Sequence, residues 1–216
     1  MRIVTFSCSR YAWMRPYHEA CFNRAWPNCP YPREWIQDDT QAGWAMTYHR
    51  WAARAGTEPT LVLLDDYMVD YVNTEAMRLA FEFCDIGGVG CVRVRACPGP
   101  TLPYHIELPV ATTFSQIDEY QRVGMMFGEI DKSLPYAVSL QAAVWRPDVL
   151  ASLILPRWTP WQVEIEGSKH AALTSWKFLA TREDGITYNE LSVKGVTQPA
   201  TLAKAKAILE EQHATA

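Results

Sequence analysis

Residues Thr60-Leu61-Val62-Leu63-Leu64-Asp65-Asp66-Tyr67 decide the fold of this chain. The continuous apolar run from Leu61 to Leu64 predicts a short strand that is buried on both faces of a sheet. The two acids that follow it mark the point where the strand reaches solvent. Because ligands of open α/β sheets bind at the carboxyl ends of the strands, Asp65 and Asp66 are candidate ligand-binding residues.

Two adjacent carboxylates repel each other, so we expect a positive group to share their site. A divalent cation, Mg²⁺ or Mn²⁺, bound to a diphosphate would serve, because Mg²⁺ favours one or two carboxylates together with substrate phosphates. The alternative is a solvated Asp-Asp turn after a strand. The first interpretation predicts a metal site at Asp65 and Asp66.

Composition sets the limits on class and partners. The chain has 216 residues, of which 49% are hydrophobic and 20% charged, and its net charge is −4. We expect one α/β domain over residues 1–216, with no repeats, no linker and no global attraction to nucleic acid. No apolar run approaches the ~20 residues of a membrane span, and the first residues suggest a strand and not a signal peptide. A cytoplasmic protein with reduced thiols is therefore expected.

The first strand is predicted at Arg2 to Ser7, and the polar loop Ser7-Cys8-Ser9-Arg10-Tyr11 follows at its carboxyl end. Arg10 and Tyr11 are candidates for contacting a nucleotide through charge and stacking, or are an ordinary surface loop. Residues 1–33 hold five arginines and one acid, Glu19. That excess suits a pyrophosphate or a polyanionic acceptor, or is a solvated face.

Periodicity and capping residues predict the remaining elements. Helices are expected at about 11–26, 44–55, 75–85 and 147–155, with another that begins near Lys169 and an amphipathic last helix at 199–213. Strands are expected at 89–96 and 136–145, and a turn at 183–185. Residues 119–127 fit a short helix or a strand.

Four short motifs together resemble small bacterial and phage glycosyltransferase-like proteins. The motifs are Leu63-Leu-Asp-Asp-Tyr67, Ser139-Leu-Gln-Ala-Ala-Val-Trp-Arg146, Pro160-Trp-Gln-Val-Glu164 and Gly167-Ser168. The family pattern is roughly L-L-x-D-Y, S-L-Q-x-x-x-W-R, a helix, then S-P-W-x-F-E with Gly-Ser close behind. This sequence has Thr159 for the serine, Val163 for the phenylalanine, and a diacid shorter than the common Asp-x-Asp.

The resemblance implies a single-domain, GT-A-like (Rossmann-like) α/β/α sandwich with a mixed, mostly parallel central sheet. It also implies an enzyme that transfers a hexosyl or pentosyl group, with inversion, from a nucleotide-diphosphate sugar to a hydroxyl acceptor. The expected donor is a UDP-sugar. On this interpretation Ser7, Ser9, Arg10 and Tyr11 contact the donor.

The acids have distinct expected roles in such a transfer. Asp66 contacts the metal, and Asp65 lies towards the ribose or the metal. Glu164 is the candidate base that takes the acceptor's proton, with Glu166 as its rival. We expect both glutamates on a strand ahead of the helix near Lys169. Trp161 would form a packing wall and sugar platform beside the base.

His170 is a candidate for a further metal or phosphate contact, although a lone histidine is more often structural. The acceptor is left open between a glycan or small hydroxylated molecule and a hydroxymethyl pyrimidine in phage-type DNA, with a slight preference for the former. A further alternative is a non-catalytic protein that binds a sugar nucleotide or nucleic acid.

Overall fold

The computed structural model describes residues 1–38, 43–85, 88–96, 102–103 and 126–215. Its main sheet has the strand order β2-β1-β3-β8-β5-β9-β7-β6 within those residues. The strands are β1 Arg2–Cys8, β2 Arg33–Asp38, β3 Thr60–Leu64, β5 Val89–Arg93, β6 Leu102–Pro103, β7 Phe127–Glu129, β8 Ala143–Trp145 and β9 Lys177–Thr181. β2, β1 and β3 are parallel to one another, as are β5 and β9, while β8 runs antiparallel between β3 and β5. The chain is thus an α/β protein with a mixed, mostly parallel sheet, compatible with a Rossmann-like fold.

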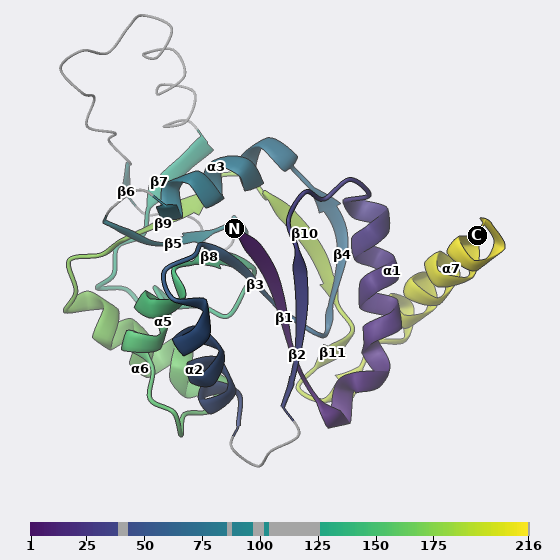
Figure 1. The fold of residues 1–216 in the computed structure, drawn as a ribbon, viewed down its shortest axis with the longest axis horizontal. Coiled ribbons are helices and arrows are strands. Elements are labelled where there is room, and N and C mark those ends of the chain that lie inside the picture. The colour runs from purple at the N-terminus through teal and green to yellow at the C-terminus, as the bar shows by residue number, and fades with distance from the viewer. Residues whose placement is uncertain (39–42, 86–87, 97–101, 104–125, 216) are drawn as a thin grey trace, which may run out of the picture.

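Helices cover both faces of this sheet. They are η1 Ser9–Met14, α1 Arg15–Ala25, α2 Trp44–Ala55, α3 Thr74–Asp85, α5 Pro147–Leu153, α6 Pro160–Ala172 and α7 Pro199–Thr215. α2, α5 and α6 gather on one side of the sheet, and α1 and α3 lie on the other (Figure 1). Within the described ranges, no helix combines the length and the apolar composition that a bilayer span requires.

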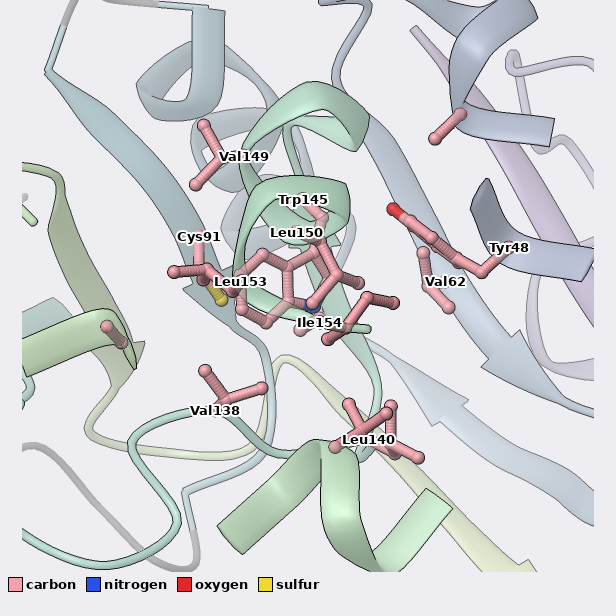
Figure 2. Packing of buried hydrophobic residues seen from close by; sticks show 14 of the residues in the cluster. Tyr48, Val62, Cys91, Val138, Leu140, Trp145, Val149, Leu150, Leu153 and Ile154 are labelled. Carbon is pink, nitrogen blue, oxygen red and sulfur yellow. The ribbon is translucent and has the colours of Figure 1, made fainter. Parts of the chain in front are cut away.

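The opening strand β3 is buried on both faces, as its apolar run predicts. Leu61 and Leu63 belong to the core on the α1 and α3 side, whereas Val62 belongs to the core on the α2 and α5 side. Figure 2 shows the core on the α2 and α5 side, where Trp145 of β8 lies among the apolar side chains of α5. Alternate side chains of one strand therefore hold the two helical layers together.

Two small antiparallel sheets lie beside the main sheet. β4 Tyr67–Val72 pairs with β10 Ile186–Glu190, and β11 Ser192–Val193 pairs with β12 Val196–Thr197. β4 was not expected from the sequence. α7 packs against α1 (Figure 1) through Ala205 and Ile208, and it covers the last helix predicted at 199–213.

Several predicted boundaries are confirmed. The helices expected at 44–55, 75–85 and 147–155 are α2, α3 and α5. α2 ends at Ala55, and Gly56 follows it with a φ of 65°, a positive value that glycine adopts at little cost. Asn73 caps α3, because its side-chain oxygen accepts a hydrogen bond from the backbone N–H of Ala76 at 3.1 Å. The turn predicted at 183–185 joins β9 to β10.

Other predictions need correction. The helix expected from Tyr11 begins only at Arg15, because residues 9–14 form the 3-10 helix η1. The strand expected over 136–145 is reduced to Ala143–Trp145, and residues 136–142 form an irregular segment that is largely buried after Tyr136. Most of the undecided stretch 119–127 lies outside the described residues.

Candidate functional site

Asp65 and Asp66 form the turn that joins β3 to β4. The backbone N–H of Asp65 donates to the carbonyl of Phe6 at 3.1 Å, so the turn starts at the carboxyl ends of both β1 and β3. The Asp65 side chain is only 7% exposed, and its Oδ2 accepts a hydrogen bond from the Ser7 hydroxyl at 2.6 Å. Burial raises the pKa of Asp65 to about 6, against the opposing effect of hydrogen bonds from Ser7 and nearby backbone.

Asp66 is less well satisfied than Asp65. Its Oδ1 is buried and has no hydrogen-bond partner among the described residues. Burial, followed by the charges of Asp65 and Glu190, raises the pKa of Asp66 to about 7. A buried carboxylate oxygen without a donor is costly, so this turn is suited to receiving a cation or a donor group from a ligand.

The chain supplies few further ligands for a metal ion at this turn. Within the described part of the chain, no cluster of three or more His, Cys, Asp or Glu side chains could hold one. The unpartnered oxygen of Asp66 nevertheless fits a hard cation such as Mg²⁺ or Mn²⁺. Such an ion would take its remaining ligands from water and from substrate phosphates, which is the usual arrangement for Mg²⁺.

The diacid lies in the wall of a cavity of about 630 Å³, which we call the first cavity. The cavity opens where β1 and β3 end, against the start of α6 and the hairpin β11–β12. Its lining residues are Phe6, Ser7, Cys8, Arg10, Tyr11, Gly43, Trp44, Thr47, Leu64, Asp65, Asp66, Pro160, Trp161, Ser192, Lys194 and Gly195. The structure therefore brings together Ser7, Arg10, Tyr11, the diacid and Trp161, as expected.

A neighbouring cavity of about 440 Å³, the second cavity, shares part of this wall. Its lining residues are Leu64, Asp66, Tyr67, Tyr136, Ser139, Leu140, Gln141, Pro160, Trp161, Glu164, Glu190, Ser192, Val193 and Lys194. Asp66, Trp161 and Lys194 line both cavities. A carboxylate, an aromatic ring and a lysine side chain therefore lie in the wall that the two cavities share.

Glu164 reaches the second cavity from α6, which corrects the predicted local structure. α6 is one helix from Pro160, and the side chains of Thr159 and Gln162 form a capping box at its start. Glu164 Oε1 accepts hydrogen bonds from the backbone N–H of Leu140 at 2.9 Å and the Ser139 hydroxyl at 3.1 Å. The candidate base is thus held in a fixed orientation at the cavity wall.

Three predicted site residues do not line either cavity. Glu166 lies two positions from Glu164 on the helix, so it points elsewhere, and its carboxylate pairs with Lys169 at 2.8 Å. His170 Nδ1 lies 3.0 Å from the carbonyl oxygen of Leu153, and its ring packs near Trp158. Ser9 begins η1 and is not among the lining residues.

Lys194 and Glu190 were missed by the sequence reasoning. Lys194 has a φ of 51° and Gly195 a φ of 81°, which places both in the two-residue turn between β11 and β12. The sequence does carry a local signal for this turn, because Lys194-Gly195 between Val193 and Val196 is typical of a two-residue hairpin loop. No local pattern shows that this turn lines the same cavities as Asp66. The Leu191 N–H, just before β11, donates a hydrogen bond to the Asp66 carbonyl at 2.7 Å and so holds the hairpin beside the diacid turn.

A comparison with models of known protein families found no matching family, and a comparison with curated proteins found no matching sequence.

Proposed function

We propose that this chain is a metal-assisted glycosyltransferase with a GT-A-like fold, which moves a sugar from a nucleotide-diphosphate sugar to a hydroxyl acceptor. The observation that supports it best is the position of Asp66. Its unpartnered carboxylate oxygen lies in the wall common to two adjoining cavities. A donor in one cavity and an acceptor in the other would meet beside this acid.

The donor nucleotide is assigned to the first cavity, which is the larger of the two and is lined by Ser7, Arg10 and Tyr11 but not by Ser9. Tyr11 offers a ring face for the base, and the Ser7–Asp65 pair offers polar groups for the ribose. Arg10 and Lys194 are the basic residues of its lining, and they suit the charge of a diphosphate. We expect a UDP-sugar, as the resemblance implies.

Asp66 is assigned to the divalent cation, Mn²⁺ or Mg²⁺. A bound cation would offset the negative charge that develops on the departing diphosphate. Asp65 keeps the turn in place, because its side chain is tied to Ser7 and its backbone to Phe6. Lys194, which lines both cavities, would add positive charge at the bond that breaks.

The acceptor is assigned to the second cavity, with Glu164 as the general base. The two hydrogen bonds at Oε1 fix the carboxylate, and Oε2 is assigned to take the acceptor's proton. The acceptor oxygen forms a bond to the anomeric carbon, and the bond from that carbon to the diphosphate breaks. The electron pair of the broken bond leaves with the nucleoside diphosphate.

Calorimetry with a panel of UDP-sugars, with and without Mn²⁺, tests the donor site. We expect Mn²⁺-dependent binding in the wild type and a loss of about 1–3 kcal/mol of binding free energy in Asp66→Asn. Asp85→Asn is the matched control, since Asp85 is an exposed acid at the end of α3 and lies outside both cavities. Donor affinity unchanged in folded Asp66→Asn would refute the assignment.

A further inference from the structure

One wall of the second cavity is the segment 136–142, which is not part of a strand and is largely buried after Tyr136. The carbonyl oxygens of its first two residues, Tyr136 and Ala137, accept hydrogen bonds from a buried arginine side chain. Arg93 of β5 is 2% exposed, and its guanidinium donates to the carbonyl oxygens of Tyr136 at 2.6 Å and Ala137 at 3.2 Å. Burying an arginine is costly, so these bonds fix the segment firmly in one position.

Side chains from two other elements bond to the rest of the segment. Ser168 Oγ accepts from the backbone N–H of Val138 at 3.0 Å, and Glu164 Oε1 accepts from that of Leu140 at 2.9 Å. The Tyr67 hydroxyl donates to the Leu140 carbonyl at 3.0 Å. These bonds satisfy several backbone groups of a segment that is not in a strand, so we expect the cavity wall to be formed before any ligand binds.

Tyr136 begins this wall in an unfavourable backbone conformation. Its φ is 61°, in the left-handed region, and its side chain is 49% exposed. A bulky residue pays a conformational penalty there, and such strain is concentrated at functional sites. The exposed ring contributes little to the core. Because Tyr136 lines the second cavity, we expect the ring to contact a ligand bound there.

The charges of the second cavity disfavour a polyanion. Three carboxylates line it, from Asp66, Glu164 and Glu190, and Lys194 is the one basic residue of the described lining. Carboxylates repel phosphates but accept hydrogen bonds from hydroxyl groups. Trp161, 64% exposed, adds a second ring face to that of Tyr136.

We propose that the acceptor bound in the second cavity is an uncharged carbohydrate, with Tyr136 and Trp161 against its ring faces and Glu190 bonded to its hydroxyls. This inference rests on the proposed function. The reacting group is one hydroxyl of that carbohydrate: its oxygen bonds to the donor's anomeric carbon, its proton passes to Glu164, and the nucleoside diphosphate leaves. A DNA base carrying a hydroxymethyl group would bring its phosphates towards the three carboxylates.

The first test compares acceptors. Donors found by calorimetry with Mn²⁺ are incubated with the wild type and either neutral disaccharides (maltose, lactose and cellobiose among others) or duplex DNA that contains 5-hydroxymethylcytosine. Released nucleoside diphosphate and product mass are measured for both. We expect sugar transfer to at least one saccharide and none to the DNA.

The second test uses a variant that retains the backbone conformation. Tyr136→Gly removes the ring and places glycine at a φ that glycine adopts readily. We expect the acceptor KM to rise at least about tenfold, the loss typical of a removed aromatic contact, with a smaller change in kcat. Tyr71→Ala is the matched control: Tyr71 is 53% exposed on β4 and outside both cavities, so its acceptor KM should equal that of the wild type.

The outcomes separate this inference from the proposed function. If donors bind but sugar passes only to 5-hydroxymethylcytosine, or to neither acceptor set, the carbohydrate assignment is overturned while the donor site stands. An acceptor KM in Tyr136→Gly equal to that of Tyr71→Ala overturns the role of the ring. If no nucleotide sugar binds with Mn²⁺, the proposed function fails, and the carbohydrate assignment fails with it.

Discussion

The buried carboxylate of Asp66 should make the metal-free protein less stable as the pH rises. Its pKa is about 7 in the fold, against 3.8 for an ordinary aspartate. Between those values the native state holds a proton that the unfolded chain releases. The free energy of unfolding therefore falls as the pH rises from 3.8 to about 7, and it is level above that, where Asp66 is ionised in both states.

The size of this effect follows from the pKa difference. One pKa unit corresponds to about 1.4 kcal/mol, so a shift of about three units sets an upper limit of about 4 kcal/mol at pH 8. Burial is the largest cause of the pKa shift at Asp66, and the charges of Asp65 and Glu190 add to it. Asp66→Asn keeps the shape and removes the charge, so it should be more stable than the wild type by about 1–4 kcal/mol at pH 8. At pH 5, which lies about a third of the way from 3.8 to 7, roughly a third of that difference is expected.

Urea unfolding at pH 5, 6, 7 and 8 in the presence of a chelator measures this difference. Asp85→Asn, at an exposed acid, is the control and should follow the wild type. Adding Mn²⁺ at pH 8 should raise the stability of the wild type and leave Asp66→Asn unchanged, because a ligand that binds only the native state stabilises it. Parallel curves for the wild type and Asp66→Asn from pH 5 to 8 would refute the reasoning.

Three further comparisons, each between a pair of variants, test the site. Glu164→Gln should lower turnover about 10²–10⁴-fold with donor affinity nearly intact, whereas Glu166→Gln, on the far side of α6, should match the wild type; equal losses in steady-state assays would contradict the assignment. Lys194→Ala should weaken donor binding about tenfold in calorimetry, and the exposed Lys206→Ala should not; the reverse would exclude Lys194 from the diphosphate site. Tyr136→Gly should be about 1 kcal/mol more stable to urea than Tyr136→Ala, because both lack the ring and only alanine is strained at positive φ; a more stable alanine variant would disprove the strain.

Local sequence patterns predicted the part of the site that lies on β1 and β3. The apolar run ending in Asp65-Asp66 specified a strand with acids at its carboxyl end, and parallel pairing with β1 places Ser7 beside Asp65. Both ideas need only the geometry of a parallel sheet. For the same reason Arg10 and Tyr11, just beyond β1, could be placed at the same edge.

The geometry of a parallel sheet does not predict the local structure around Glu164. Val163 and Ile165 alternate with Glu164 and Glu166, which is a strand pattern, yet α6 is a helix. The Thr159–Gln162 capping box and Pro160 at the first helical position carry the helix signal. In a helix, residues two positions apart point to different sides, so Glu164 faces the second cavity and Glu166 does not. Only the assignment of this segment as a helix decides between the two candidate bases.

The segment 136–142 shows why a buried apolar sequence did not become a strand. Its composition fits β structure, but Arg93, Ser168, Glu164 and Tyr67 already bond to its backbone. These partners come from distant parts of the chain, so no local pattern could reveal them.

Glu164 consequently has two tasks, one structural and one proposed for catalysis. Its Oε1 holds Leu140 and Ser139, so removing the side chain would disturb the wall of the second cavity as well as the base. Glu164→Ala therefore cannot separate the two tasks. Glu164→Gln can, because an amide oxygen still accepts both hydrogen bonds while the group no longer takes a proton. Normal stability with lost turnover in that variant would assign the catalytic task to the carboxylate itself.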